Sequence, residues 1–507
     1  MCRAISAICS IPRRVNASPE THDLIVVGGG AAGATCAGRL SELRPDLSIA
    51  LVEAGPSDRH PLVRMPFGLV ALMGSRRDWR FRSAPQAALG GRTVSIPRGR
   101  MLGGSASINS MVWFRGRADD YSHWGPGWGW DDVALVFDAV EAEMRPAPLR
   151  DPHPLSRAFG QVHGGPPDPE RVSSGPFIVN LENGRRRSPV DAFLTGRAVR
   201  MVIGSEVERL LFDGHRATGI RLVGGAEMRA RAGVVLCAGA IGSPVLLMRS
   251  GIGPGAVLAR AGIDLLQDSP GVGENLHDHP AVAVHHEGPG SGRGLTWAQL
   301  PDWALSPFRW ALTGRGPLAS NTVEAGAFLA GDDGTPRWQV HFIPARLGHG
   351  KRAIGWGAGY YADVCLMQPR SRGRLTLGPD GAPVIDLGLL TDGADRAEMR
   401  QGFRLLRKLL RDAPFGRRRA PEVYPACGDD DAALDAHLDA RLGTAYHPVG
   451  TCGIGRVVDR ILAVQGLEHL WVADASVMPR ITSANTNAPS IMIGYRGAQM
   501  VADALRA

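Results

Sequence analysis

The first strong hydrophobic pattern in the chain is the apolar run 23–27, which is rich in β-branched residues and ends at Gly28. Small and apolar residues then recur at helical spacing from 31 to 43, and a second apolar run, 47–52, ends at Glu53. A buried parallel strand is a near-continuous apolar run, whereas a helix repeats every 3.6 residues. The pattern therefore predicts a βαβ unit.

Strand-like and helical patterns continue along the chain in two different orders. Two later regions again have strands followed by a helix, as in the βαβ unit. The first has strands at 206–212, 217–223 and 233–237 and a helix at 243–249, and the second has a strand at 470–473 and a helix at 489–505. Between about 285 and 435 the pattern changes. Aromatic and β-branched runs there, 324–329, 338–343 and 361–367, are typical of antiparallel strands with intervening helices.

These patterns predict an α/β fold of two parts. A Rossmann-like nucleotide-binding domain with a βαβ unit is expected to be discontinuous, built from 21–144, 188–280 and 441–507. An α+β substrate-binding or cap domain with an antiparallel sheet takes 145–187 and 281–440. Residues 1–20 are expected to be a disordered tail.

Composition excludes several classes of protein. The 57 basic and 49 acidic residues give a formal charge of +8, but the densest basic runs, 185–187 and 417–419, are three residues long and lack aromatic neighbours, so no nucleic-acid partner is expected. The seven cysteines contain no C-x-x-C pair, which favours neither a disulfide framework nor a metal site and suits a cytoplasmic location. No apolar run reaches the length of an integral membrane segment.

A glycine motif follows the first predicted strand. Gly28, Gly30 and Gly33, with Ala31 and Ala32 between the last two, fit G-x-G-x-x-G at the start of a helix. The first glycine permits the tight turn, the second admits a pyrophosphate and the third lets the helix pack on the strand. Glu53 and the adjacent Ala54 end the second strand, where a carboxylate accepts the hydroxyls of a ribose. The sequence thus predicts a dinucleotide site.

Five further segments, read with this unit, resemble the glucose-methanol-choline (GMC) family of FAD-dependent oxidoreductases. They follow the order of the family's motifs along nearly the whole chain: 97–116 (PRGRMLGGSASINSMVWFRG), 239–253 (GAIGSPVLLMRSGIG), 271–280 (GVGENLHDHP), 447–452 (HPVGTC) and 471–489 (WVADASVMP running into NTNAP).

The resemblance implies an FAD held by backbone and side-chain groups from several of these segments. Ile108 stands where some relatives carry the histidine that tethers the flavin, which implies non-covalent FAD. The residues implied in binding, beyond those of the βαβ unit, are Gly103, Gly104, Asn109, Met111, Val112, Val207, Asp474, Ala475, Asn487 and Pro489.

His447 is the candidate catalytic base. Removing a proton from an alcohol while a hydride leaves its carbon needs a group of near-neutral pKa that bears transient positive charge, and imidazole has these properties. The resemblance places Asn487 as the partner that orients the substrate oxygen; the alternative is an asparagine that caps the turn before Pro489. The pair His277 and His279 lacks a third ligand at suitable spacing, so no metal is predicted there.

The resemblance therefore implies oxidation of the CH–OH group of a small-molecule alcohol by hydride transfer to N5 of FAD, with His447 as base. The electrons then pass to a quinone, another acceptor or O2. Alternatives within the family are a lyase and a light-driven fatty-acid decarboxylase, and a non-catalytic flavoprotein is a further one. Four aromatic positions, Trp338, His341, Phe342 and Tyr361, line the substrate pocket or pack in the core.

Overall fold

The computed structural model describes residues 20–347, 356–425 and 427–506. The predicted disordered tail lies outside this range, except for Glu20, which is the first residue of a strand.

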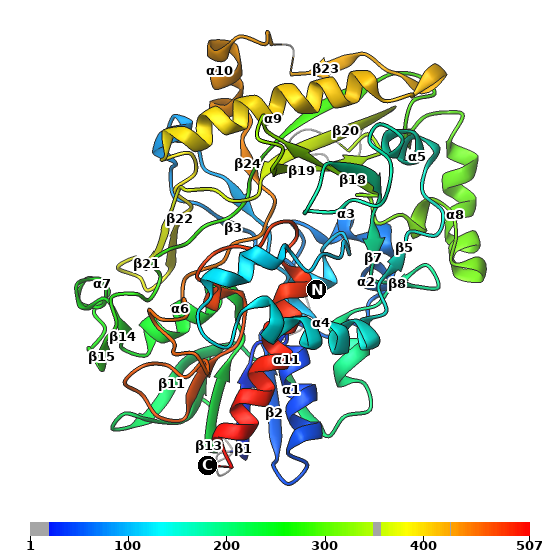
Figure 1. Cartoon of the computed structure of the whole chain (residues 1–507). Coiled ribbons are helices and arrows are strands. Elements are labelled where there is room, and N and C mark those ends of the chain that lie inside the picture. Colours follow the sequence, from blue (N-terminus) through cyan, green and yellow to red (C-terminus); the bar gives the residue numbers. More distant parts are fainter. Residues whose placement is uncertain (1–19, 348–355, 426, 507) are drawn as a thin grey trace, which may run out of the picture.

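The predicted βαβ unit is confirmed. Strand β1 (Glu20–Val27) is followed by α1 (Ala31–Leu43) and β2 (Ile49–Glu53), and the two strands pair in parallel with Leu24 opposite Ile49. They form the centre of a seven-stranded sheet, seen edge-on in the lower half of Figure 1. Its order is β10 (Val199–Ile203), β2, β1, β13 (Glu227–Leu236), β12 (Arg216–Leu222) and β11 (Val207–Asp213), with β25 (Leu470–Val472) paired to β13.

Helix α11 (Asn487–Ala504) packs along α1, so the two ends of the nucleotide-binding region meet on one face of this sheet (Figure 1). Small residues make the contact close. A Cβ at Gly494 would lie 2.3 Å from the carbonyl oxygen of Ala32. This packing fixes the start of α11, and with it the residues just before it, relative to the glycine motif at the start of α1.

The second sheet is antiparallel and eight-stranded. Its main path is β23 (Glu422–Tyr424), β16 (Pro280–Glu287), β20 (Gly357–Leu366), β19 (Pro336–Ile343), β18 (Ala325–Ala330) and β6 (Ser173–Pro176), with β17 (Gly294–Leu295) on β20 and β24 (Gly443–Thr444) on β16. The antiparallel character predicted for the middle of the chain is confirmed. The strand β16 was not predicted, and β13 begins earlier than predicted, because both contain polar stretches in place of an apolar run.

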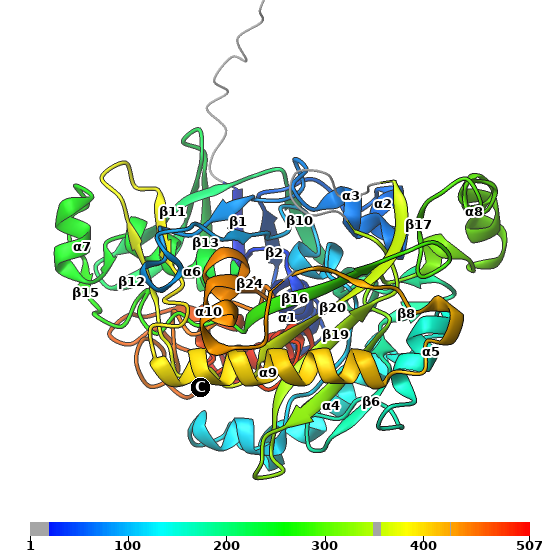
Figure 2. The same cartoon turned by 90° about the horizontal axis from the view of Figure 1, so that it is seen from above.

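The long helix α9 (Gly393–Asp412) covers the second sheet, and Figure 2 shows it running across β19 and β20. Gly402 lets α9 approach Trp338, since a Cβ there would lie 2.5 Å from the indole ring. Trp338 and Phe342 are fully buried, and Phe342 stacks on Phe159. These two aromatic residues therefore belong to the core, whereas His341 and Tyr361 face the cavity described below.

The remaining helices and short strands lie between the strands of these two sheets along the chain. The helices are α2 (Pro61–Arg64), α3 (Leu69–Leu72), α4 (Trp130–Met144), α5 (Pro154–Gly160), α6 (Gly239–Arg249), α7 (Gly255–Arg260), α8 (Leu300–Thr313) and α10 (Asp431–Arg441). The strands are β3 (Phe81–Arg82), β4 (Ser95–Ile96), β5 (Ala147–Pro148), β7 (Ile178–Val179), β8 (Leu181–Glu182), β9 (Arg185–Arg186), β14 (Ile252–Gly253), β15 (Gln267–Asp268), β21 (Arg374–Leu377) and β22 (Pro383–Asp386). Within the described part of the chain, no helix has the length and apolar character that crossing a membrane requires.

Candidate active site

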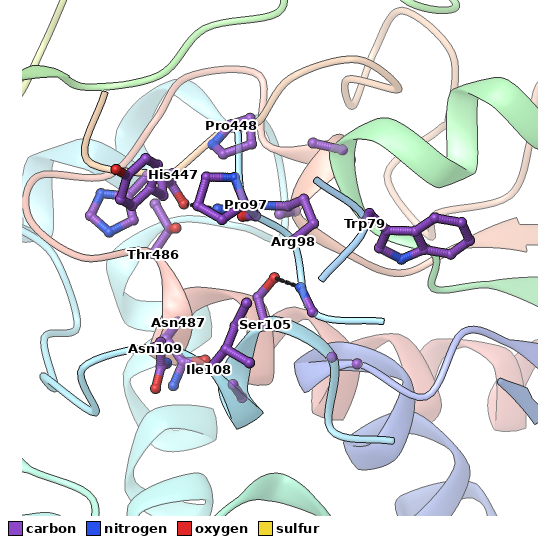
Figure 3. A pocket seen from close by; sticks show the side chains of 18 of the residues that line it. Trp79, Pro97, Arg98, Ser105, Ile108, Asn109, His447, Pro448, Thr486 and Asn487 are labelled. Atoms are coloured by element: carbon purple, nitrogen blue, oxygen red, sulfur yellow. Dashed lines mark hydrogen bonds between the residues drawn. The ribbon is translucent and has the colours of Figure 1, made fainter. Parts of the chain in front are cut away.

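A cavity of about 960 Å³ extends from the carboxyl ends of β1 and β2 to the second sheet. Val27 and Val52 line one end, and residues of β16, β19 and β20 line the other. Such a position, at the carboxyl ends of parallel strands, is the usual binding site of open α/β sheets. Figure 3 shows Ser105, Ile108, Asn109 and Asn487 on one side of the cavity and His447 with Thr486 on another.

Two glycine-containing loops meet at the nucleotide end of the cavity. Gly28 has φ +101°, and a Cβ there would lie 2.5 Å from the carbonyl oxygen of Cys237. The N–H of Gly103 donates to the carbonyl of Gly29 at 2.7 Å. A Cβ on Gly104 would lie 2.7 Å from Cα of Gly30. The two loops thus touch through bare backbone. The N–H groups of Gly28, Gly29, Gly103 and Gly104 are bound within the protein, so the start of α1 is the part that can donate to a phosphate.

Glu53 closes this end of the cavity. Its Oε2 accepts the N–H of Gly29 at 2.8 Å and its Oε1 accepts the N–H of Gly55 at 2.7 Å. Burial raises the pKa of the carboxyl group, while these two hydrogen bonds oppose the rise. Each oxygen retains a lone pair, so the side chain still has the capacity to accept ribose hydroxyls.

Asn109 is held by a buried arginine. The guanidinium of Arg186 donates to Oδ1 of Asn109 at 2.7 Å, to its main-chain oxygen at 2.8 Å and to the carbonyls of Ala106 and Val63. Burial lowers the pKa of Arg186 to about 9, so the group keeps its charge at neutral pH. Because Oδ1 is occupied, the donor end of the Asn109 amide is the end available to a ligand.

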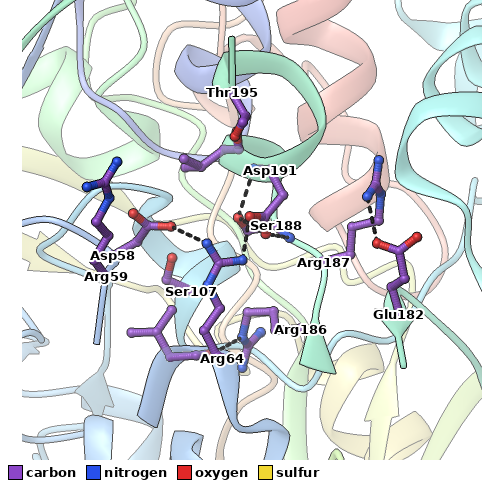
Figure 4. Close-up of polar contacts among 12 residues, drawn as sticks. Asp58, Arg59, Arg64, Ser107, Glu182, Arg186, Arg187, Ser188, Asp191 and Thr195 are labelled. Atoms are coloured by element: carbon purple, nitrogen blue, oxygen red, sulfur yellow. Dashed lines mark hydrogen bonds and ion pairs between the residues drawn. The ribbon is translucent and has the colours of Figure 1, made fainter. Parts of the chain in front are cut away.

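Figure 4 shows the ion pairs beside this arginine. Arg64 lies between Asp58 and Asp191, and Asp191 also accepts hydrogen bonds from the N–H and the hydroxyl of Ser188 at 2.9 Å. This network anchors the segment that carries Arg186 to the segment around α2. The segment that carries Asn109 is thereby supported, through Arg186, by charged groups that do not line the cavity.

The carboxyl group of Asp474 has a structural role. Its Oδ2 accepts the N–H of Gly239 and the hydroxyl of Ser243, at 2.9 and 2.5 Å, and its Oδ1 accepts the N–H of Ser476 at 2.8 Å. Burial raises its pKa. Asp474 thus joins the start of α6 to the segment after β25, and both segments line the cavity.

The site fits FAD. The glycine loops form a cradle that a Cβ would fill, and Nδ2 of Asn487 is buried at the cavity without a hydrogen-bond partner among the described residues. An unpaired buried amide is costly unless a ligand accepts from it. A flavin carbonyl has the chemistry to do so.

Most of the residues predicted to bind the cofactor line this cavity, and three do not. Gly33 packs α1 against the turn, where a Cβ would lie 1.8 Å from the carbonyl oxygen of Gly28. Gly103 faces the side chain of Ser107, since a Cβ there would lie 2.2 Å from its Oγ. Pro489 is inside the first turn of α11. The residues that line the cavity are Gly28, Gly30, Ala31, Ala32, Glu53, Ala54, Gly104, Asn109, Met111, Val112, Val207, Asp474, Ala475 and Asn487.

His447 faces the cavity from the segment after β24. Asp278 fixes its backbone by accepting the N–H of His447 at 2.8 Å. The Nδ1 atoms of His447 and His279 are 3.0 Å apart, and Nε2 of His447 lies 3.1 Å from Nδ2 of Asn485. Burial, helped by His279, His341 and Arg98, lowers the pKa of His447 well below 6.5. The imidazole is therefore neutral at pH 7 and able to accept a proton.

Asn485, and not Asn487, contacts His447. The two asparagines are two residues apart, but Asn485 precedes α11 and Asn487 is its first residue. Both line the cavity. The motif around 485–489 identified this segment correctly, yet spacing alone gave no means of choosing which amide reaches the histidine.

The segment 277–279 supports His447. The ring of His277 is held between the carbonyl of Asn275 and the N–H of Ile481, at 2.6 and 2.9 Å. Asp278 and His279 contact His447 as described. Burial lowers the pKa values of His277 and His279 to about 3 and raises that of Asp278 to about 7.

The fold and the site define a class of protein: a dinucleotide-dependent α/β oxidoreductase with a neutral histidine facing the cavity. Two models of the GMC oxidoreductase family match residues 22–281 and 369–494. The chain is 34% identical to the alcohol dehydrogenase [acceptor] of Pseudomonas putida, over 95% of each chain. It is 35% identical to the oxygen-dependent choline dehydrogenase of Brucella suis, over 94% of this chain and 95% of the relative.

Solved structures agree with these matches. The pyridoxine 4-oxidase of Mesorbium loti superimposes with a TM-score of 0.82 at 30% identity, over 94% of this chain and 98% of that one. The formate oxidase of Aspergillus oryzae has a TM-score of 0.84 at 24% identity, over 95% and 98%, and this likeness shows the fold alone. The chain belongs to the GMC oxidoreductase family. The expected fold, the FAD cofactor and the action on CH–OH donors are confirmed.

Proposed function

We propose that the chain oxidises a small alcohol with His447 as the catalytic base and Asn485 as the group that holds the substrate oxygen. The observation that carries this proposal is the contact between Nδ2 of Asn485 and Nε2 of His447 at the wall of a cavity that fits FAD. A substrate hydroxyl that replaces this contact would donate to Nε2 of His447 and accept from Nδ2 of Asn485.

The proposed reaction needs only two changes at the substrate. The O–H proton passes to Nε2 of His447, and the C–H hydrogen leaves with its electron pair, so that a carbonyl forms. FAD, when bound, supplies the acceptor for that hydride. Asn485 fixes the orientation of the carbinol carbon, and Asn487 donates to the cofactor instead of to the substrate.

The first substrates to test follow from the relatives. Choline, pyridoxine and simple primary alcohols represent the compounds named for them. The likeness to the alcohol dehydrogenase [acceptor] supports a dehydrogenase that passes electrons to a quinone or a similar acceptor, and the likeness to the oxygen-dependent choline dehydrogenase keeps O2 as the alternative acceptor. The cytoplasmic location and the lack of a nucleic-acid partner stay predictions from the sequence.

Non-covalent binding of FAD is part of the proposal. Ile108, the aliphatic residue at the position where the resemblance puts the tether, lines the cavity and is 5% exposed, which supports this part of the proposal. Acid precipitation of the purified protein should release all the flavin into the supernatant. Flavin that stays in the pellet would contradict this point.

The experiment that tests the proposed roles is anaerobic flavin reduction by the best alcohol found. His447→Gln should abolish reduction at unchanged flavin content. Asn485→Ala should slow reduction by about a hundredfold, whereas Asn487→Ala should mainly weaken flavin binding. Normal reduction by His447→Gln would refute the mechanism, and the reverse pattern for the two asparagines would restore Asn487 as the orienting residue.

A further inference from the structure

Two strands of the second sheet carry a row of polar side chains toward Asn485. His341 and Gln339 are alternate residues of β19, and they lie opposite Asp363 and Cys365 of β20 in the antiparallel register. Nδ1 of His341 is 2.8 Å from Oδ1 of Asp363, and Nε2 of His341 is 3.4 Å from Nδ2 of Asn485. The row therefore links Asp363 to His447 through His341 and Asn485.

Gln339 sets the orientation of the Asn485 amide. Nε2 of Gln339 donates to Oδ1 of Asn485 at 3.0 Å, while the thiol of Cys365 contacts Oε1 of Gln339 at 4.0 Å. With Oδ1 occupied by a donor, the NH2 group of Asn485 must point toward His341 and His447. Both histidine Nε2 atoms are then hydrogen-bond acceptors.

The hydrogen bond between His341 and Asp363 agrees with this orientation of the Asn485 amide. An ionised carboxylate only accepts, so Nδ1 of His341 carries a proton and its Nε2 has the lone pair. Asn485 donates one N–H to that lone pair and the other to Nε2 of His447. His447 therefore has its proton on Nδ1.

The other side of His447 is compatible with this assignment. Nδ1 of His447 faces Nδ1 of His279, so one of the two nitrogens must donate. With the proton of His447 on Nδ1, Nδ1 of His279 is the acceptor. The proton of His279 is then on Nε2, which has no hydrogen-bond partner among the described residues.

We propose that Asp363, acting through His341 and Asn485, is a positioning residue that keeps the proton of His447 on Nδ1 and its lone pair on Nε2. This inference rests on the proposed role of His447 as the base. Only the Nε2 lone pair faces the substrate hydroxyl, so a histidine in the other tautomer has no acceptor there. The carboxylate of Asp363 touches neither the proton that is transferred nor His447.

The direct test is the tautomer itself. Long-range 1H–15N correlation spectra of histidine-labelled holoenzyme, with His447 assigned by its loss in His447→Gln, should show an unprotonated Nε2 and a protonated Nδ1 at pH 7.5. A protonated Nε2 in the wild-type protein would overturn the inference without any variant of Asp363.

The functional test is Asp363→Asn. An amide presents either an oxygen or an NH2 group to His341, so the proton of His341 is no longer fixed on Nδ1. Nε2 of His341 is then no longer a fixed acceptor for Asn485. Flavin reduction should slow by about tenfold to a hundredfold, less than the loss seen when a triad carboxylate is neutralised, with the KM changed less than twofold. Glu20→Gln is the matched control, because it neutralises a carboxylate 3.0 Å from a histidine ring in β1, away from the cavity.

A double-mutant cycle separates positioning from direct action on the substrate. In His341→Gln, Oε1 accepts from Asn485 whatever the charge of Asp363, so adding Asp363→Asn should cost less than twofold. An equal loss from Asp363→Asn in both backgrounds would overturn the inference. If His447→Gln itself reduces flavin normally, the proposed function fails; if it is inactive and Asp363→Asn is normal, only the present inference fails.

Discussion

Gly104→Ala should weaken FAD binding because two loops of the cradle touch at this residue. Gly104 has φ +51°, and an added Cβ would lie 2.7 Å from Cα of Gly30. Ordinary van der Waals contact begins near 3.4 Å, so the loops must separate by about 0.7 Å. Gly90→Ala is the matched control, since Gly90 has φ +62° and nothing within 4 Å of the added Cβ.

The structure sets the size of the effect. Both variants incur about 1–2 kcal/mol for an alanine in the left-handed region. Gly104→Ala adds an overpacking cost of about 1–3 kcal/mol. Because the displaced groups are those that face the cofactor, we expect that second cost to appear in FAD affinity, as a loss of roughly fivefold to 150-fold.

The assay is titration of the apoprotein with FAD, followed by flavin fluorescence, with urea unfolding of each variant alongside. Gly90→Ala should bind FAD like the wild type and lose only stability. Equal FAD affinity in the two variants would refute the argument that the contact between Gly30 and Gly104 shapes the cofactor site.

Three further predictions use other parts of the site. Arg186→Lys should lower the free energy of unfolding by about 2–3 kcal/mol, because one ammonium cannot donate to all the oxygens of Val63, Ala106 and Asn109 that the guanidinium joins. Urea unfolding measures this loss, and the control is Arg187→Lys, the same substitution at the neighbouring arginine, which is more exposed. The folded pKa of His277, about 3 against 6.5, means that protons favour the unfolded state below pH 6.5, so between pH 7 and 5 the wild type should lose about 2 kcal/mol more stability than His277→Gln. The lowered pKa of His447 keeps the base unprotonated at pH 6.5 and above, so the rate of flavin reduction should stay level from pH 9 to 6.5 and fall only at lower pH; a half-maximal rate near pH 6.5 would contradict this.

The local part of the fold was accessible from the sequence. The helix predicted over 31–43 has the same bounds in the structure, because small residues and the glycine motif fix where it begins. The strand β16 was missed since its second half, His285 to Glu287, is polar. Those residues are accommodated between β20 and the short strand β23, an arrangement that depends on contacts distant in sequence.

The sequence identified which segments form the site, but it did not identify which side chains contact one another there. His447 and the segment 485–489 were found because their residues follow one another in a motif. Whether Asn485 or Asn487 reaches His447 depends on where α11 begins, and α11 is held by Gly494 against α1. A helix start set by packing with a distant helix leaves no mark two residues away in the sequence.

The row of polar side chains on β19 and β20 is a second case in which the sequence does not predict the contacts. His341 and Asp363 each look like a polar residue in a half-buried strand, and only the register that places them opposite each other gives them a joint role. That register belongs to the second sheet, whereas His447 lies in the segment that joins β24 to β25, and Asn485 lies in the segment that joins β25 to α11. If the proton on His447 is placed as we propose, substitutions in the second sheet alter the base as well as the shape of the substrate pocket. Specificity and rate are then not separable by choosing residues from one sheet.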